Sequence, residues 1–413
     1  MNYPIDKYKS EASTTFSSLL KTFKGWTNMW QIGNVFDTLT DYVVRFPDAE
    51  PSPGAVAKAA LDRWKNTEGC WYDDYGWWGI AAAKAFDDRY ASIFGADRRV
   101  FQAMATHCWD VMHTGKPNKG AFSYKGGPLV WANRDEGTQP GYFTSPDTWA
   151  EPRIPGGVWQ YDMFNYTRLE ECSPSNPSDP NQVTLGPFQL TVMNGLYLVL
   201  ALRLRLQGQG TETDGAIKSE MGFLNAWFDL EKDESLLWRF SDNGLLVRER
   251  VATYQKCDAT NSYPPVQGYH ADGAWGGDQG LILGGLLDYL SVEPSDPVAQ
   301  SRAISIARGV FSHMVDAQGV MPYSTGFDVH YDADDYSCGL GVFWRYLLWG
   351  FGQNAALRKE VLKWVAEDPE NNEIYKSAEN ALSRQRPGNA LFADFNILAT
   401  LTAAIEILKE ANG

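Results

Sequence analysis

The sequence is short of positive charge and of long apolar runs, and both shortages narrow the range of partners. Its 36 Lys and Arg residues face 51 Asp and Glu residues, which gives a formal net charge of -15. A nucleic-acid backbone or an anionic membrane surface would repel such a chain. No window approaches the roughly 18 uninterrupted apolar residues that a membrane-spanning helix needs. We therefore expect neither nucleic acid nor a membrane as a partner.

The usual signatures of disulfide, metal and cofactor chemistry are also missing. The five cysteines form no C-x-x-C pair, so neither a disulfide framework nor a zinc site is predicted. The five histidines form no H-E-x-x-H pattern, and no G-x-S-x-G, Walker or dinucleotide-binding motif is present. We expect no metal and no cofactor. A structural cation stays open as an alternative at an acidic group that lacks the ligand spacing of a calcium loop, namely Asp328, Asp332, Asp334 and Asp335.

The N-terminal residues do not have the pattern of an export signal. Met1 is followed by a polar, mixed stretch, without a charged segment that leads into an apolar core. The expected location is the cytoplasm. The alternative is a secreted or cell-surface protein whose N-terminus was trimmed.

Aromatic residues, in contrast, are abundant. They make up 14% of the chain, with 16 Trp, in a composition that is otherwise that of a globular protein. Aromatic rings suit the apolar C–H faces of sugar rings, although many Trp side chains serve only as core filler. The composition is thus compatible with an oligosaccharide or polysaccharide partner.

Helical periodicity dominates the chain. Apolar residues recur at i, i+3 and i+4 in segments near 8–23, 31–46, 54–66, 73–90, 96–114, 188–206, 214–229, 276–291, 297–315, 338–352, 355–367 and 393–410, with a shorter one near 372–384. Alternating runs, as in 245–253, predict at most a few small hairpins. The sequence therefore predicts an all-α protein.

The connections between these segments favour a helical toroid. Short connections alternate with three long ones, 116–187, 238–275 and 317–337, which would gather at one mouth of an (α/α)6 barrel. No composition break divides the chain, so we expect a single domain over residues 1–413. Two separate helical bundles remain an alternative, whereas an α-solenoid would show a fixed repeat that is absent.

Two adjacent acids open the segment 73–90. Asp73 and Asp74 are carboxylates of the kind that cap helix N-termini, but they are surrounded by Trp71, Tyr72, Tyr75, Trp77 and Trp78. Such an aromatic frame can stack on a sugar. Neighbouring carboxyl groups at a helix start lie near the ~5–5.5 Å separation of retaining glycosidases. Because like charges oppose each other, one acid can be protonated while the other is ionised. We therefore predict a catalytic pair.

The same residues carry a family resemblance. Asp73-Asp74-x-x-Trp77-Trp78, after Tyr72, resembles the aspartate-pair motif of glycoside hydrolase family 76, the endo-α-1,6-mannanase family. Two further segments, Gly156-Gly157-Val158-Trp159 and Asp278-Gln279-Gly280, resemble that family's Gly-Gly-aromatic loop and its Asn-Gln-Gly helix start. The resemblance implies an (α/α)6 barrel, retaining cleavage of α-1,6-mannosidic bonds, Asp73 as nucleophile and Asp74 as acid/base.

Some positions depart from that family. Asp278 stands where the family usually has Asn, Gln160 stands where a second Trp is common, and a late Phe-Lys-Gly-Ile-Phe stretch is missing. The predicted substrate-binding residues are Tyr72, Tyr75, Trp77, Trp78, Trp159, Asp278, Gln279, His270 and Trp275. For Asp278 and Gln279 a purely structural role at a helix start is an equal alternative, and His270 is equally compatible with a surface loop.

Two other functions stay open. A polysaccharide lyase or a sugar epimerase on the same toroid would need His, Tyr, Arg or Lys to move a proton next to a carbonyl, whereas the strongest constellation here is acidic and aromatic. A non-catalytic glycan-binding toroid would tolerate the loss of one carboxylate, and this chain has both. No pattern in the sequence sets an oligomeric state.

Overall fold

The structure is a computed structural model of the 413-residue chain. It describes residues 2–67, 69, 72–114, 158, 182–183, 190–208, 212–229, 235–252, 255–256, 269–271, 273–322, 324–325, 336–383 and 390–413. All structural statements below concern these residues.

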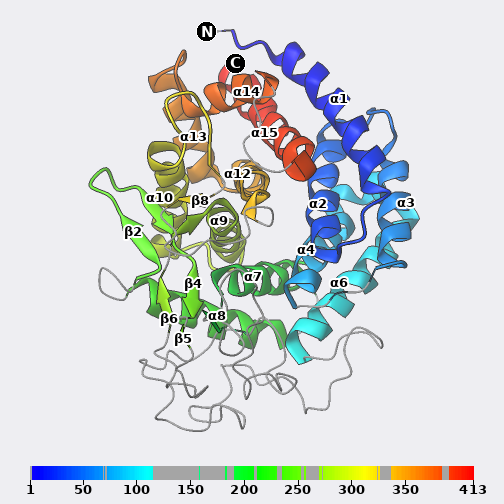
Figure 1. Ribbon diagram of the computed structural model, residues 1–413, viewed down its shortest axis with the longest axis horizontal. Helices are drawn as coiled ribbons and strands as arrows, with labels where there is room; N and C mark the ends of the chain where they lie inside the picture. The colour runs from blue at the N-terminus through cyan, green and yellow to red at the C-terminus, as the bar shows by residue number, and fades with distance from the viewer. Residues whose placement is uncertain are drawn as a thin grey trace.

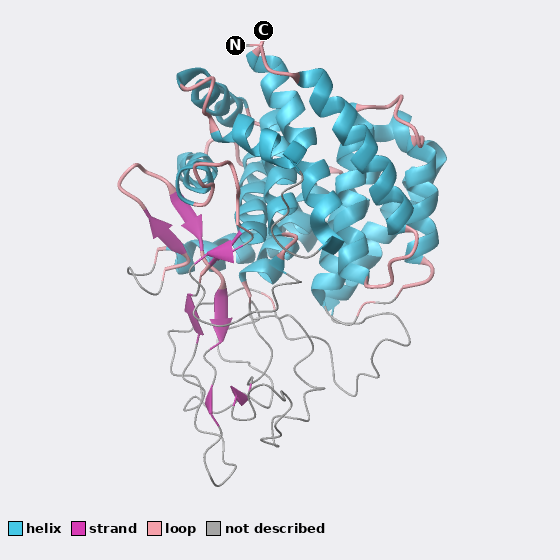
Figure 2. Ribbon diagram, turned by 45° about the horizontal axis from the view of Figure 1, so that its top comes forward, coloured by secondary structure: helices cyan, strands magenta, loops and turns pink. Residues whose placement is uncertain are grey.

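Helices make up most of the described chain (Figure 2). They are α1 (Ile5–Phe23), α2 (Met29–Arg45), α3 (Pro53–Trp64), α4 (Tyr72–Phe86), α5 (Ala91–Phe94), α6 (Arg98–Thr114), α7 (Thr191–Leu206), α8 (Glu212–Phe228), α9 (Gly276–Val292), α10 (Pro297–His313), α12 (Gly339–Gln353), α13 (Ala355–Glu367), α14 (Glu373–Ser383) and α15 (Ala390–Ala411), with short 3-10 turns at Asp88–Tyr90 and Gly95–Asp97. Each segment with helical periodicity in the sequence corresponds to one of the long helices. The all-α prediction is confirmed.

The strands are short and form antiparallel pairs only. They are β1 (Gln182–Val183) with β5 (Gln255–Lys256), β2 (Leu237–Arg239) with β3 (Leu245–Val247), β4 (Arg250–Ala252) with β6 (Tyr269–Ala271), and β7 (Ala274–Trp275) with β8 (Ser324–Thr325). In the β2–β3 hairpin Leu237 lies opposite Val247. The strands lie to one side of the helical body (Figure 2).

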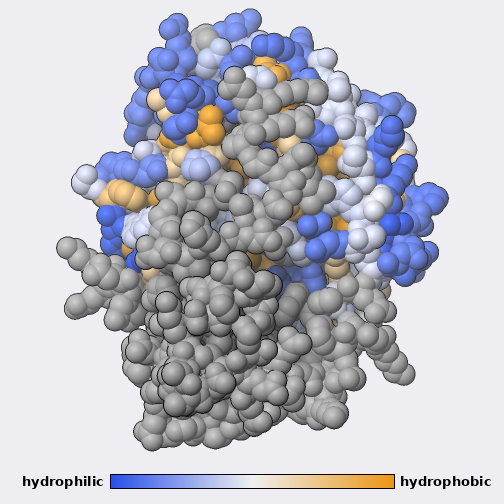
Figure 3. Space-filling view, in the orientation of Figure 1, coloured by the Kyte–Doolittle hydropathy of each residue, from blue (hydrophilic) through white to orange (hydrophobic). Residues whose placement is uncertain are grey.

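Six helices form a closed inner ring. Along this ring α2 contacts α4, α4 contacts α7, α7 contacts α9, α9 contacts α12, α12 contacts α15, and α15 returns to α2 (Figure 1). Helices α1, α3, α6, α8, α10 and α13, with α14, pack around the outside, so the chain alternates between an outer and an inner helix. This arrangement is an (α/α)6 toroid, as predicted. Hydrophilic residues cover most of its described rim (Figure 3).

Close glycine contacts show that the inner helices all run in the same direction. A Cβ atom added to one glycine near the start of each of five inner helices would lie within 2.9 Å of an atom near the start of the next helix: Gly33, Gly76, Gly195, Gly280 and Gly341. Each contact joins the first two turns of both helices. The N-termini of the inner helices therefore lie at one end of the toroid, which we call the mouth.

Charged side chains fill the toroid axis beyond the first turns. Lys84 on α4 places Nζ 2.5 Å from Asp37 Oδ1 and 2.9 Å from Asp41 Oδ2, both on α2. Arg345 on α12 places Nε 3.1 Å from Asp37 Oδ2. All four side chains are at most 3% exposed. Burial acts to raise the pKa of Asp37, but Lys84 and Arg345 outweigh it and hold that pKa below its usual value.

A second ion pair continues this cluster towards α7 and α9. Arg203 places Nε 3.3 Å from Asp288 Oδ2, and its Nη1 donates to the carbonyl of Ile80 on α4 at 3.2 Å. Trp349 on α12 donates its indole N–H to Asp288 Oδ1 at 2.7 Å. We call the whole group the axial ion cluster: Asp37, Asp41, Lys84, Arg203, Asp288 and Arg345. It connects five of the six inner helices.

Within the described segments, no helix combines the length and apolar character that a membrane crossing requires. The same segments contain no group of three or more His, Cys, Asp or Glu side chains arranged to hold a metal ion.

The glycine contacts predict a large difference between two Gly→Ala substitutions. In Gly280→Ala the new Cβ would lie 2.8 Å from the carbonyl carbon and oxygen of Val342. These are backbone atoms of α12, which cannot move aside by a change of rotamer as a side chain can. We expect a loss of about 1–3 kcal/mol in the free energy of unfolding. The control is Gly222→Ala on α8, where nothing lies within 4 Å of the added Cβ, and there we expect a gain of ~0.5–1 kcal/mol. Urea unfolding measures both, and equal effects would contradict the close helix approach.

Lys84→Met tests the axial ion cluster. The substitution leaves two buried carboxylates of α2 without their shared ammonium group, so we expect a loss of about 3–5 kcal/mol in unfolding free energy. Lys363→Met is the control, because Lys363 is 54% exposed and its nearest carboxylates lie 3.8 Å away, where surface pairs contribute less than ~1 kcal/mol. Urea unfolding measures both variants. Comparable losses would show that the ion pairs of Lys84 contribute little to the free energy of unfolding.

Candidate active site

The predicted acid pair lies at the mouth of the toroid. Asp73 and Asp74 are in the first turn of α4, where free backbone N–H groups and the helix macrodipole favour carboxylates. Asp73 is partly exposed, whereas Asp74 is 4% exposed. The backbone N–H of Trp30, in the first turn of α2, donates to Asp74 Oδ1 at 3.2 Å. The pair thus joins the beginnings of two neighbouring inner helices.

Helix geometry assigns different directions to the two acids. Asp73, Trp77 and Lys84 are spaced i, i+4 and i+11, which places them on one face of α4. Lys84 belongs to the axial ion cluster, so this face looks towards the axis. Asp74 is turned by about 100° from Asp73. Its contact with Trp30 shows that it points towards α2. Asp73 is therefore the axial carboxyl group, and Trp77 follows it one turn further in.

Two of the aromatic residues predicted to bind substrate lie on the outer side of α4. The Tyr75 ring is 6.0 Å from the His107 ring on α6, and the Trp78 ring is 5.3 Å from the Trp64 ring on α3. Tyr75 is 1% exposed and Trp78 is 0% exposed. They fill the layer between the inner and outer rings, behind the acid pair. Tyr72 is equally buried, and substrate contact by these three residues stays a prediction.

Gln279 at the start of α9 is bound to backbone. Its Oε1 accepts from the N–H of Val247 at 2.7 Å, and its Nε2 donates to the carbonyls of Val247 and Trp275 at 2.6 and 2.9 Å. The Trp275 indole N–H in turn donates to the carbonyl of Tyr336 at 2.7 Å. These bonds fasten β3 and β7 to α9, which is the structural role that the sequence left open. Contact of Gln279 or Trp275 with substrate stays a prediction.

Asp278 faces a second buried carboxyl group, that of Glu249. Glu249 Oε1 accepts from the N–H of Thr191, the first residue of α7, at 2.5 Å, and both acids are at most 1% exposed. Burial, and then the neighbouring Glu249, raise the pKa of Asp278 well above its usual value. Burial and the neighbouring acid thus both favour the protonated form of Asp278, between the starts of α7 and α9. Sequence reasoning missed Glu249, because nothing near it in the chain identifies its partner.

The Gly-Gly-aromatic segment is described at one position only. Val158 donates its N–H to Asn194 Oδ1, in the first turn of α7, at 2.7 Å. Residue 158 therefore lies at the mouth. Trp159 and the acidic group from Asp328 to Asp335 lie outside the described residues. So does the His270 side chain, although its backbone pairs with Val251 across β4 and β6.

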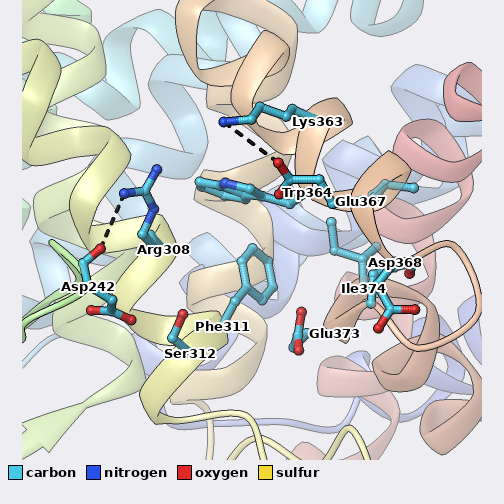
Figure 4. Close-up of a pocket in the computed structure, with 12 residues that line it drawn as sticks. Asp242, Arg308, Phe311, Ser312, Lys363, Trp364, Glu367, Asp368, Glu373 and Ile374 are labelled. Atoms are coloured by element: carbon cyan, nitrogen blue, oxygen red, sulfur yellow. Dashed lines mark hydrogen bonds and ion pairs between the residues drawn. The ribbon is translucent and has the colours of Figure 1, made fainter.

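A pocket of about 370 Å³ lies apart from the acid pair, on the outer wall between α10, α13 and α14 (Figure 4). Three of its charged lining residues, Arg308, Lys363 and Asp242, have polar partners nearby. Arg308 Nη1 donates to the carbonyl of Asp242 at 3.3 Å, and Lys363 Nζ is 3.8 Å from Glu367 Oε1. Asp242 also lies 3.1 Å from the ring of His313. The pocket is a junction of the outer helices α10, α13 and α14, and its lining contains more acidic than basic residues.

No protein-family model matches the sequence, and no curated protein matches it. Solved structures do match. The chain resembles the α-1,6-mannanase GH76A from Salegentibacter sp. HEL1_6 at 13% identity and a TM-score of 0.57, over 96% of this chain and 99% of that one.

Two further structures have the same fold. The Lin0763 protein from Listeria innocua is 13% identical, with a TM-score of 0.54 over 99% of both chains. Dfg5 from Chaetomium thermophilum, in complex with glucosamine, is 12% identical, with a TM-score of 0.53 over 92% of this chain and 80% of that one. At these identities the likeness establishes the fold. The resemblance to glycoside hydrolase family 76 is thus confirmed as a shared helical toroid.

The Asp278–Glu249 pair predicts a pH dependence of stability. A carboxyl group whose pKa is raised by folding contributes stability that is complete below the unfolded-state pKa and is lost as pH rises through the folded-state pKa. Asp278→Asn keeps a hydrogen-bond donor towards Glu249 without a titrating proton. We expect the wild type to lose up to ~1.4 kcal/mol per pH unit relative to this variant between the two pKa values. Urea unfolding from pH 5 to 9 measures this difference, and parallel profiles would contradict a raised pKa of Asp278.

Proposed function

We propose that the protein is a retaining glycoside hydrolase that cleaves α-1,6-linked mannan or manno-oligosaccharides, with Asp73 and Asp74 as its catalytic carboxyl groups. The observation that carries the proposal is the position of this pair, in the first turn of an inner helix at the mouth of an (α/α)6 toroid. One acid faces the axis and its neighbour faces α2.

The solved structures support this choice of substrate. The Salegentibacter enzyme is an α-1,6-mannanase of this fold. An inactive variant of it, with two consecutive aspartates replaced by alanine, was solved in complex with α-1,6-mannotetrose, at a TM-score of 0.57 to this chain. This chain has two consecutive aspartates at the start of an inner helix, in the segment that resembles the family's motif.

Asp73 fits the role of nucleophile. Its carboxylate faces the axis, where a sugar ring in the mouth would lie, and the N-terminus of α4 stabilises its negative charge. Attack on the anomeric carbon forms a glycosyl ester while the bond to the leaving oxygen breaks. Because the axial ion cluster fills the axis beyond this level, substrate would approach from the mouth.

Asp74 fits the role of acid and base. As the acid it gives its proton to the leaving oxygen, and as the base it then takes a proton from the water that hydrolyses the ester. A close neighbouring carboxylate disfavours ionisation of both groups at once, which keeps a proton available for the first step. The Trp30 N–H holds Asp74 Oδ1 in place, so the orientation of this carboxyl group is fixed by α2.

Asp73→Asn and Asp74→Asn should each lower turnover of linear α-1,6-mannan by about 10³-fold or more, because groups that act together in one mechanism each cause large losses. Melting temperatures should change little. Asp6→Asn is the control, because Asp6 is an acid in the first turn of the outer helix α1. NMR of the wild-type reaction should show the α-anomer first, since adjacent carboxyls leave no room for an attacking water.

Three results would contradict this proposal. Near-normal turnover in either Asn variant would remove that residue from the mechanism. A large fall in melting temperature with activity retained would show that the acids only cap α4. The β-anomer appearing first would require a base more distant from the sugar.

A further inference from the structure

Trp30 faces the toroid axis. Trp30, Asp37 and Asp41 are spaced i, i+7 and i+11 on α2, so their side chains leave the helix on one face. The two aspartates of this set bind Lys84 in the axial ion cluster. The face that carries Trp30 therefore points into the ring, towards the mouth end of the axis.

Trp30 also lies at the same height as the acid pair. Lys84 on α4 and Asp41 on α2 form an ion pair at 2.9 Å. On α4, Asp73 precedes Lys84 by eleven residues, and on α2, Trp30 precedes Asp41 by eleven residues. At 1.5 Å rise per residue, both therefore lie about 16 Å above it towards the mouth. The bond from the Trp30 N–H to Asp74 Oδ1 shows that α2 and α4 keep this alignment up to their first turns.

The Trp30 ring has a fixed orientation and a partly exposed surface. It stacks on the Phe392 ring of α15 with centroids 5.5 Å apart and an interplanar angle of 29°. Phe392 itself is 0% exposed and is held by the edge of the Trp26 ring at 6.0 Å. Trp30 is partly exposed. A stacked indole keeps its remaining surface for a ligand with little further loss of rotamer freedom.

We propose that Trp30 is the aromatic platform of the sugar subsite next to Asp74, where it packs against the C–H face of a neutral pyranose ring. The inference rests on the proposed function. Because the Trp30 N–H binds the Asp74 carboxyl group, the distance between the indole platform and the acid/base is fixed. The subsite therefore binds the sugar that carries the leaving oxygen. A neutral ring is favoured because Asp73 and Asp74 would repel a uronate.

Binding to an inactive protein separates this role from chemistry. In the Asp73→Asn/Asp74→Asn background, isothermal titration with α-1,6-mannotriose is compared for Trp30, Trp30→Leu and Trp30→Phe. We expect Trp30→Leu to weaken binding about tenfold, which corresponds to ~1.4 kcal/mol. Trp30→Phe keeps an aromatic ring on Phe392 and should weaken binding by less. Thermal melts of each variant verify folding.

Trp64→Leu is the matched control. Trp64 is also partly exposed and also packs on an aromatic ring, that of Trp78, but it belongs to the outer helix α3. We expect unchanged affinity in this variant. If Trp30→Leu and Trp30→Phe both bind mannotriose with an affinity within twofold of the parent, the platform role of Trp30 is wrong. That result would leave the proposed substrate standing. Absence of mannotriose binding by the folded parent would overturn the proposed substrate, and the subsite with it.

Discussion

The axial ion cluster is the constraint on which the rest of the structure depends. Three cationic and three anionic side chains lie in the interior of the inner ring, contributed by α2, α4, α7, α9 and α12. Removing such groups from water is costly unless every charge finds its partner. Two of these pairings join neighbouring helices, α2 with α4 and α7 with α9. The Arg345–Asp37 pair joins α12 to α2, so the cluster is complete only when helices from both ends of the chain come together. The cluster occupies the interior of the ring beyond the first turns of the helices, and the acid pair lies on the mouth side of it.

The same cluster sets the alignment of the candidate site. Lys84 pairs with Asp41 deep in the ring, and the Trp30 N–H binds Asp74 at the mouth. These two contacts lie at opposite ends of the same pair of parallel helices, so a shift of α2 against α4 would break both. The position of the acid pair is therefore determined by the packing of whole helices, which is a more precise scaffold than a loop.

Much of this fold could be predicted from the sequence, because amphipathic periodicity reports helices regardless of their partners. The direction of each side chain on α4 could not. An inner helix of a toroid is buried on its outer side by the second ring and on its inner side by the ring interior. Trp77 and Trp78 are therefore both buried, and hydrophobicity alone does not show which of them faces the axis. Contacts between residues far apart in the chain could not be predicted from the sequence either. Trp30 precedes Asp74 by more than forty residues, and Glu249 follows Thr191 by more than fifty.

The departure at Asp278 has a physical meaning that the sequence comparison alone does not give. An Asn at this position could donate to the Glu249 carboxylate at any pH, whereas Asp278 can do so only while it holds a proton. Burial therefore favours the protonated form of Asp278 at the junction between α7 and α9. Asp73 is partly exposed, whereas Asp74, Asp278 and Glu249 are buried. Asp74 accepts from the backbone of α2 and Glu249 from the backbone of α7, so these buried acids join the starts of inner helices.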